Sequence, residues 1–293
     1  MEIDGTTEDI HIDAGGYTHE AVEAGVAGGL FDDSKPDGGV SSGNNAAVAV
    51  LECKGVIDVS GVEGVTLTFG VEGAVPGADG LLTYYTGHGT LTLNVATGKY
   101  SFVPDQNLSA GQKATDTVTV TVAAQGQGGT ASVELTFNIT GTNDMPTIEL
   151  NAPKVTFEQS VNTDAPAPAG GGSFSGNVHS SDPDADDGLG NVENGFNARL
   201  HYKILPVEKG QHATTVTEDA NGIITAVTKF GTLTFNTKDG SYTYEVNQDP
   251  GFDWKDLPKD YKDTFTFRVI DSHGSYVDKT LSVPLNGIND VPT

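Results

Sequence analysis

Four carboxylates stand within six residues in the segment 181–188, which reads Ser-Asp-Pro-Asp-Ala-Asp-Asp-Gly. Such charges repel one another unless a cation offsets them. Calcium takes about 6–8 oxygen ligands and tolerates irregular geometry, so alternating aspartates in a loop can turn toward one ion. Asp182, Asp184 and Asp186 have the spacing of the first three ligands of an EF-hand loop, and Glu193 stands at the position of its last ligand. We therefore expect a calcium-binding loop here.

This loop differs from a true EF-hand in two ways. Asp187 replaces the glycine expected at the sixth position, and no helical pattern flanks the segment. The spacing argument for calcium holds without the EF-hand fold. The alternative is an acidic loop that is simply solvated.

The other chemically capable side chains do not form a known catalytic pattern. The histidines are scattered, and His11 and His19 stand among carboxylates without the partners of a zinc site. Neither a nucleophile elbow nor a phosphate loop occurs. Paired carboxylates can hydrolyse glycosides, but here they cluster in turns and no cleft is indicated. We expect a protein that is not an enzyme.

The chain is strongly acidic. Its 293 residues include 15 lysines and arginines against 40 aspartates and glutamates, a net charge of −25. Because phosphates and anionic lipids are bound by Lys and Arg, this balance argues against nucleic acid and membrane surfaces as partners. It favours cations or high-salt surroundings, with acidity for solubility alone as the alternative. No apolar run reaches the length of about 18 residues that a membrane-spanning helix needs.

Much of the sequence occurs twice. Residues 89–94 (GTLTLN) return as 231–236 (GTLTFN), 142 positions later. Residues 116–120 (DTVTV) return as DTFTF and residues 141–147 (GTNDMPT) as GINDVPT, at offsets of 147 and 146. A nearly constant offset indicates a duplicated unit that is long enough to bury its own core. The predicted domains are 1–146 and 147–293.

The expected fold is all-β. Residues 231–246 alternate, turn and alternate again, which predicts a hairpin in which Tyr242 and Tyr244 meet Leu233 and Phe235. A second hairpin is predicted over 263–285. Earlier strands of the second unit are predicted at 154–158, 173–179, 198–205 and 222–228. About 7 to 9 strands per unit fit two tandem immunoglobulin-like Greek-key β-sandwich domains.

Two segments depart from the strand pattern. Residues 14–48 hold either a short helix over Thr18 to Val26 or a segment without fixed structure. Residues 248–262 are predicted to form a crossover loop in which Trp254 caps the sandwich. The single cysteine, Cys53, lies in an apolar run and is expected to be a buried side chain without reactivity. Since no intrachain disulfide can form, bound metal is the expected brace of a secreted chain.

Residues 178–188 and 197–204 resemble a cadherin repeat, whose pattern is Val-x-Ala-x-Asp-x-Asp-x-Gly followed by Asn-Ala-x-Leu-x-Tyr-x-Ile. The Gly-x-Asn-Asp-x-Pro segments at 141–146 and 287–292 resemble the cadherin linker. The hairpin ending in Ser-Tyr-Thr-Tyr, with the Asp-Thr-Phe-Thr-Phe strand after it, is closer still to bacterial VCBS repeats. Those repeats are cadherin-like modules of giant RTX adhesins that leave the cell by type I secretion.

This resemblance implies calcium at the joint between successive modules. The metal would be shared by a Glu near the start of a module, by the linker and by the Asp-x-Asp loop, and Asn143 would contribute through its backbone carbonyl. Asn289 and Asp290 would serve a following module. The predicted metal ligands are Asn143, Asp144, Glu158, Asp182, Asp184, Asp186, Asp271, Asn289 and Asp290.

Two departures from the cadherin pattern limit this expectation. Gly141 and Met145 stand where cadherins have Asp and Asn, which implies fewer ions or weaker binding. In the first unit, residues 55–64 align with 176–185, and the loop carboxylates are reduced to Glu63. We expect most of the metal in the second unit and at the joint over 143–158.

The resemblance implies an extender or adhesion module of a bacterial surface adhesin, in which calcium stiffens the joints and projects a distal binding domain. The expected partners are neighbouring repeats, homotypic contacts as in biofilm, and host or surface glycans. The alternative is a glycan- or peptide-binding module that uses aromatic side chains of the irregular segments, namely Phe31, Phe252, Trp254 and Tyr261. Because residues 1–30 hold no signal peptide and the pattern starts and stops abruptly, we expect a piece of a larger secreted protein.

Overall fold

The computed structural model describes residues 11–12, 16–26, 47–48, 50–60, 64–125, 129–151, 157–159, 172–184, 186–187, 195–207, 214–247 and 260–287. Their regular structure is β-strand apart from one 3-10 helical turn, η1 (Ala78–Gly80). No helix among them has the length and apolar character needed to cross a membrane. The described residues form two compact units, one made of those up to Asp144 and the other of those from Met145 onward.

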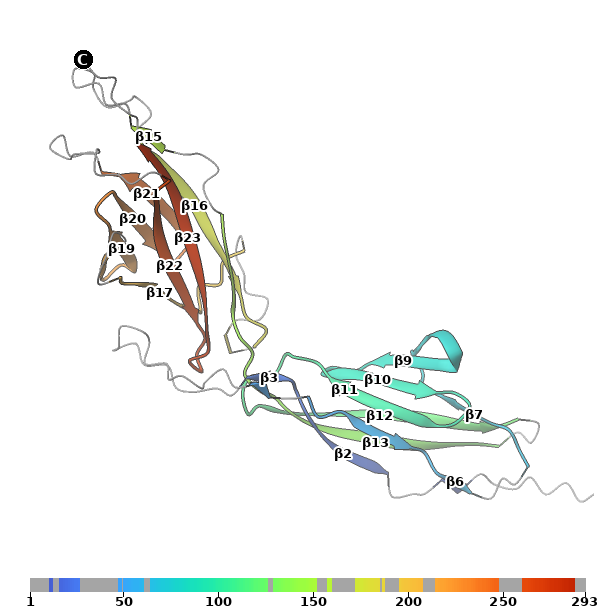
Figure 1. Cartoon of the computed structure of the whole chain (residues 1–293). Coiled ribbons are helices and arrows are strands. Elements are labelled where there is room, and N and C mark those ends of the chain that lie inside the picture. Colours follow the sequence, from blue (N-terminus) through green and yellow to red (C-terminus); the bar gives the residue numbers. More distant parts are fainter. Residues whose placement is uncertain are drawn as a thin grey trace, which may run out of the picture. The chain divides into compact units, whose positions relative to one another are not determined.

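The first unit is a sandwich of two sheets (Figure 1). One sheet contains β5 (Cys53–Val56), β8 (Val75–Pro76), β9 (Leu81–Tyr85), β10 (Gly89–Asn94) and β11 (Lys99–Pro104), in the order β5-β11-β10-β9-β8. The other contains β2 (Tyr17–Val22), β7 (Leu67–Gly70), β12 (Lys113–Ala124) and β13 (Thr130–Thr140), in the order β2-β13-β12-β7. Two short pairs flank them, β1 (His11–Ile12) with β6 (Val59–Ser60) and β3 (Gly25–Val26) with β4 (Ala47–Val48).

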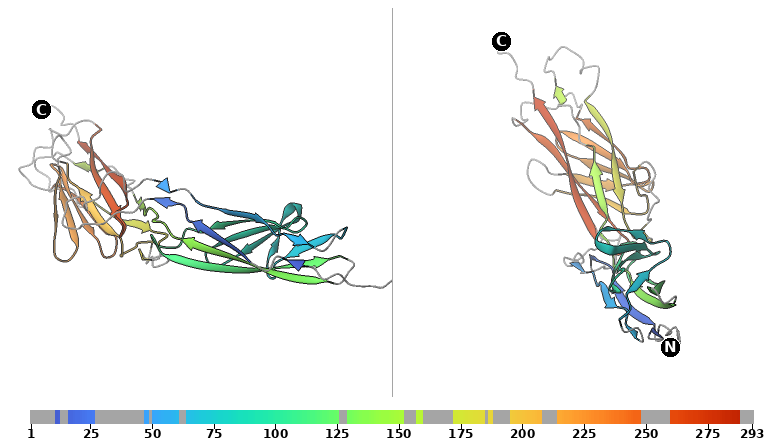
Figure 2. Two further views of the ribbon diagram at one scale, coloured as in Figure 1. Left: turned by 90° about the horizontal axis from the view of Figure 1, so that it is seen from below. Right: turned by 90° about the vertical axis from the view of Figure 1, so that its right-hand side faces the viewer.

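The second unit has the same two-layer construction, seen from two further sides in Figure 2. Its larger sheet contains β14 (Thr147–Leu150), β16 (Ser173–Ser181), β18 (Thr215–Glu218), β19 (Ile223–Val227), β20 (Gly231–Asn236) and β21 (Ser241–Val246), in the order β14-β16-β21-β20-β19-β18. The smaller sheet contains β15 (Phe157–Gln159), β17 (His201–Leu205), β22 (Lys262–Ile270) and β23 (Tyr276–Gly287), in the order β15-β23-β22-β17.

The strand order is immunoglobulin-like in both units. An early strand joins the last strand in parallel, as β2 does with β13 and β15 with β23, while the other neighbours in these sheets are antiparallel. The chain also crosses between the sheets as a Greek key requires, since β16 pairs with β21 and not with β17. The predicted fold class, two tandem β-sandwich domains, is confirmed.

Alternation of apolar and polar residues builds the two cores. In β12 the buried valines Val118, Val120 and Val122 alternate with outward threonines, because successive side chains of a strand point to opposite faces. Across the sandwich, the rings of Phe102 and Phe137 stack with centroids 4.0 Å apart. Each buried side chain of this size contributes about 1.5–3 kcal/mol by leaving water.

The predicted hairpin of the second unit is present with the predicted facing residues. Leu233 pairs with Tyr244 and Phe235 with Tyr242, and all four side chains are buried. The strand predicted at 198–205 begins later, at His201, because residues 198–199 form a turn in which the amide of Arg199 bonds to the Asn197 side chain. β18 was not predicted.

One glycine position shows that the two units are built alike. Gly55 stands opposite Tyr100, and a Cβ added there would lie 2.4 Å from the tyrosine oxygen. Gly176 stands opposite Tyr242 in the same way, at 2.6 Å. The alignment of residue 55 with residue 176 is therefore confirmed, and in both units a tyrosine ring lies over a bare backbone.

The helix considered over Thr18 to Val26 is wrong. The segment forms β2, in which Ala21 is buried, and its backbone bonds to β13. Parallel backbone pairing with the long strand β13 outweighs the weak local preference of this Gly- and Ala-rich sequence for helix. Cys53 is buried as predicted, and burial raises the pKa of its thiol. Most of residues 14–48 and 248–262, with Phe31, Phe252 and Trp254, lies outside the described residues.

Candidate metal-binding sites

Three aspartates of the loop after β16 converge in the second unit. Carboxylate oxygens of Asp182, Asp184 and Asp187 all lie within 4.8 Å of one another. The three residues are almost fully buried, with 3%, 0% and 1% of their surface exposed. The structure thus brings two of the predicted ligands together and adds Asp187, which the sequence pattern had assigned to the position of a glycine.

The local turn explains why Asp187, not Asp186, joins this group. Oδ1 of Asp182 accepts the backbone N–H of Asp184 at 2.9 Å, which folds the loop back on itself. The chain then turns at Asp186 and Asp187, so that Asp186 is exposed and Asp187 is buried. Asn197 stabilises this turn, because its side-chain amide donates to the backbone oxygen of Asp187 at 2.7 Å.

The loop between β22 and β23 supports the cluster from the other side. Ser272 donates two hydrogen bonds to Asp187, from its backbone N–H to Oδ1 at 2.8 Å and from its hydroxyl to Oδ2 at 2.9 Å. Asp271 is fully buried, and its Oδ1 accepts the N–H groups of His273 and Ser275. Asp271 therefore shapes the loop that positions Asp187, and it is not a member of the aspartate trio.

Electrostatics makes this cluster costly in the absence of a cation. Burial raises the pKa of Asp187, and the charge of Asp186 raises it further, while the hydrogen bonds from Ser272 and the nearby His273 lower it. Three carboxylates in so small a volume repel one another, and burial removes the water that would screen them. Their oxygens form a hard donor set, which suits calcium or magnesium and not a thiolate-preferring metal.

A second group overlaps the first at the surface. Carboxylate oxygens of Asp186 and Asp187 and a ring nitrogen of His273 also lie within 4.8 Å of one another. Nε2 of His273 is 3.8 Å from Asp186, and Nδ1 is 3.9 Å from Asp187. When protonated, His273 is thus positioned to compensate part of the negative charge at the mouth of the aspartate cluster.

The first unit has its own acidic cluster, built by Glu23, Asn107 and the linker residues Asn143 and Asp144. Glu23 follows β2 and is fully buried. Its Oε1 accepts the backbone N–H groups of Asn107 and Leu108, each at 3.2 Å. Its Oε2 has no hydrogen-bond partner among the described residues, and neither has the side-chain oxygen of Asn107. These are acceptor oxygens directed into the protein.

The linker aspartate lies beside Glu23. Burial raises the pKa of Asp144, and burial together with the charge of Asp144 raises the pKa of Glu23. Gln106 donates to Oδ1 of Asp144 at 3.3 Å and to the backbone oxygen of Ala24 at 2.8 Å. Two neighbouring buried carboxylates with raised pKa values are the charge pattern that a bound cation would offset.

Backbone pairing places this cluster. Glu23 donates its N–H to Thr140, and the hydroxyl of Thr142 donates to the backbone oxygen of Glu23 at 3.1 Å. The linker is thereby fastened to the strand that carries Glu23. Asn143 is buried, and its side-chain amide donates to the backbone oxygen of Asp144 at 2.8 Å.

Sequence reasoning missed Glu23, Asn107 and Asp187. Carrying the duplication back to the first strand would have reached only the residue before Glu23, because Val22 pairs with Thr140 as Glu158 pairs with Asn286. No motif pointed to Asn107. Glu158 lies in β15, but its side chain is outside the description, as are Glu63, Glu193, Asn289 and Asp290.

No family model matches the chain, and no curated protein matches it in sequence. Solved structures that resemble it include Drosophila N-cadherin EC1-4, at 15% identity over 96% of this chain and 50% of that one, with a TM-score of 0.36. Others are protocadherin gamma B2 domains 3-6, at 11% identity over 96% and 48% (TM-score 0.36), and the human desmocollin-1 ectodomain, at 14% over 97% and 42% (TM-score 0.32). The chain thus spans about half the length of these structures or less.

Proposed function

We propose that the chain is a calcium-braced extender and adhesion module of a bacterial surface adhesin. The observation that carries this proposal is the buried Oε2 of Glu23, which lacks a hydrogen-bond partner among the described residues and belongs to the cluster of Asp144. The aspartate trio of the second unit supports it independently. The bacterial and surface assignment rests on the likeness of the hairpin and of the Asp-Thr-Phe-Thr-Phe strand after it to VCBS repeats.

The role of calcium follows from where the linker is fastened. Asp144 is the last residue of the first unit, and Met145 begins the second. An ion held by Glu23, Asn107 and Asp144 fixes the end of the linker to the body of the first unit. Extracellular calcium sites bind at about 10⁻⁴–10⁻³ M. At a calcium concentration about a hundredfold above the dissociation constant, one site adds about 2.7 kcal/mol of stability.

Glu23→Gln tests the proposal in the full chain by thermal melting and calorimetric titration with calcium. In EDTA the variant is expected to melt no lower than the parent chain, because a buried charge next to Asp144 has been removed. With millimolar calcium the parent chain is expected to gain several degrees and the variant clearly less. Glu134→Gln, which makes the same change at an exposed position of β13, is the control.

The result separates a metal ligand from a structural glutamate. If Glu23 has only a structural role through Oε1, Glu23→Gln should change the melting temperature by the same amount with and without calcium. Asp184→Asn provides the corresponding measurement in the second unit, with the exposed Asp58→Asn as its control. If calcium leaves the melting temperature of the parent chain unchanged, the proposed function is wrong.

A further inference from the structure

Two cavities adjoin along β17 in the second unit. The first has a volume of about 330 Å³ and is lined by residues 198–202, by Glu218 and by the turn residues Thr237 and Lys238. The second has a volume of about 190 Å³ and is lined by residues 203, 204, 206, 216–218 and 224. Glu218 lines both, and the two cavities together are called the groove. The first cavity alone falls in the size range of ligand pockets, about 300–1,000 Å³.

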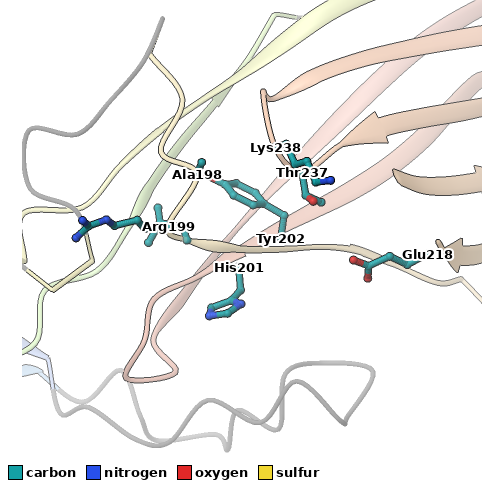
Figure 3. A pocket seen from close by; sticks show the side chains of 8 residues that line it. Ala198, Arg199, His201, Tyr202, Glu218, Thr237 and Lys238 are labelled. Atoms are coloured by element: carbon teal, nitrogen blue, oxygen red, sulfur yellow. The ribbon is translucent and has the colours of Figure 1, made fainter. Parts of the chain in front are cut away.

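Basic residues outnumber acidic ones in the lining of the groove, whereas the whole sequence is acidic. Acidic residues outnumber basic ones 40 to 15 in the sequence, yet Glu218 is the single carboxylate among the groove-lining residues. The other charged side chains in the lining are those of Arg199, Lys203 and Lys238, and His201 lines the first cavity as well. In Figure 3, Arg199 and Glu218 lie at opposite ends of the first cavity, with Lys238 and His201 between them. An elongated ligand with negative charge complements this distribution.

The second cavity is apolar. Its lining includes Ile204, Pro206, Val216 and Ile224. Ile204 and Ile224 belong to the buried core, and Val216 packs against it, so a side chain seated here would extend the core outward. A branched aliphatic side chain fits this environment, and burying one would add favourable apolar contact.

Two outermost strands form the walls of the groove. Within the described residues, β17 has β22 as its only strand neighbour, and β18 has only β19. An outermost strand presents backbone N–H and C=O groups on its second side. An extended peptide can bond to such groups as an added strand, while its alternate side chains enter pockets. A polysaccharide could meet the cationic side chains but would leave these backbone groups unused.

We propose that this groove binds an extended peptide strand of a partner protein, in which an acidic residue meets Arg199 and Lys238 and an aliphatic residue on the same side of the strand enters the apolar cavity. The spacing follows from strand geometry, because side chains two residues apart point the same way. None of the residues that line the groove belongs to the aspartate cluster.

The first experiment measures binding of a fluorescein-labelled ten-residue peptide to the full chain by fluorescence anisotropy. The peptide alternates Thr with Glu and Val, so that the acidic and aliphatic residues share one face. Binding is expected to weaken with added salt and by about tenfold in the double variant Arg199→Glu and Lys238→Glu. The control is Lys99→Glu with Lys113→Glu, an equal charge change at two exposed positions of the first unit.

A second measurement does not depend on variants. In the ¹⁵N-labelled parent chain, the peptide is expected to shift the amide resonances of 201–205 and 215–218 and to leave those of β10 and β11 unchanged. The proposal is overturned if a peptide with Lys in place of Glu binds equally well, if the two double variants bind alike, or if the shifts fall elsewhere. Binding of alginate at these amides without binding of the peptide would assign the groove to an acidic polysaccharide and overturn it as well.

Discussion

Asp116 and Asp263 occupy equivalent positions in the two units, but different partners hold their carboxylates. Asp263 is fully buried and accepts hydrogen bonds from the hydroxyls of Thr228 at 2.7 Å, Tyr244 at 2.6 Å and Tyr261 at 2.8 Å. Asp116 accepts the backbone N–H of His88 at 2.8 Å, and its other oxygen lies 2.9 Å from Nδ1 of the same residue. Asp263 is thus stabilised by hydroxyl donors alone, and Asp116 by His88 together with the Thr86 hydroxyl.

Asp263→Asn is expected to destabilise the second unit by about 2–3 kcal/mol, because an amide N–H₂ would face hydroxyl donors where a charged acceptor stood. Urea unfolding of the full chain, followed through resonances of β20–β23, measures this loss. Asp58→Asn, at an exposed position in the first unit, is expected to change the free energy of unfolding measured at these resonances by less than about 0.5 kcal/mol. If Asp263→Asn and Asp58→Asn unfold at the same urea concentration, the three hydroxyl donors do not stabilise Asp263 as proposed. Tyr261 is one of these hydroxyl donors and its side chain is buried, so it is not available for stacking on a ligand.

The clustered carboxylates predict an unusual pH dependence without metal. Burial raises the pKa values of Glu23, Asp144 and Asp187. A carboxyl group with a raised folded-state pKa binds protons more tightly in the folded chain, so stability increases as the pH falls from neutral toward the ordinary carboxyl range of about 4. In EDTA the melting temperature should therefore rise on mild acidification. Saturating calcium should remove this rise, because it holds the carboxylates ionised.

Asp116 has the opposite effect on stability, because its contribution decreases as the pH falls. Burial alone would raise its pKa, but the hydrogen bonds and charge of His88 and the Thr86 hydroxyl outweigh burial, so the pKa lies below its ordinary value. Its stabilising contribution is present above the ordinary carboxyl pKa and is lost as the pH falls through the lowered one. A melting temperature in EDTA that falls continuously from pH 7 downward would contradict the raised pKa values of the clusters.

At the scale of elements, the close approach of tyrosine to glycine predicts equal sensitivity in both units. Gly55→Ala and Gly176→Ala would each place a Cβ within 2.4–2.6 Å of a tyrosine side chain that is itself buried. Each is expected to cost about 1–3 kcal/mol, since the ring must move in a packed core. Thermal or urea unfolding measures the loss. Gly77→Ala, whose Cβ would meet its nearest atom at 3.5 Å, should be close to neutral.

The regular strands could be predicted because their side chains alternate. β20 and β21 show strict alternation and a tight turn, which fixes their register without reference to the rest of the fold. β2 could not be predicted in this way. Its sequence YTHEAV alternates weakly, and its position depends on parallel pairing with β13, more than a hundred residues away. Contacts at that separation are not visible in a local pattern.

The same distinction applies to the candidate metal sites. Asp182 and Asp184 stand two apart in one loop, so their convergence was predictable from spacing. Asp187 faces them only because Ser272, from the β22–β23 loop, holds its carboxylate. Glu23 and Asn107 are 84 positions apart, and the backbone N–H of Asn107 donates to the carboxylate of Glu23. These residues are brought together by the sandwich, not by a motif.

At the scale of the whole chain, charge and linker belong to one argument. A net charge of −25 opposes compaction, and the self-repulsion is screened by salt in general but offset at particular points only by bound cations. The buried carboxylates of Glu23 and Asp144 concentrate part of this charge where the linker leaves the first unit. Calcium there is expected to act on the freedom of the linker more than on the fold of either sandwich.

Small-angle scattering tests this expectation in the full chain. With millimolar calcium, the pair-distance distribution should lengthen and become more sharply defined than in EDTA, because a fastened linker samples fewer orientations. Sodium chloride at matched ionic strength controls for screening and should not reproduce the change. Glu23→Gln should reduce the calcium response while each unit keeps its β-sheet circular dichroism. If calcium raises the melting temperature but leaves the scattering curve unchanged, the metal stabilises the sandwiches without stiffening their connection, and the extender role is wrong.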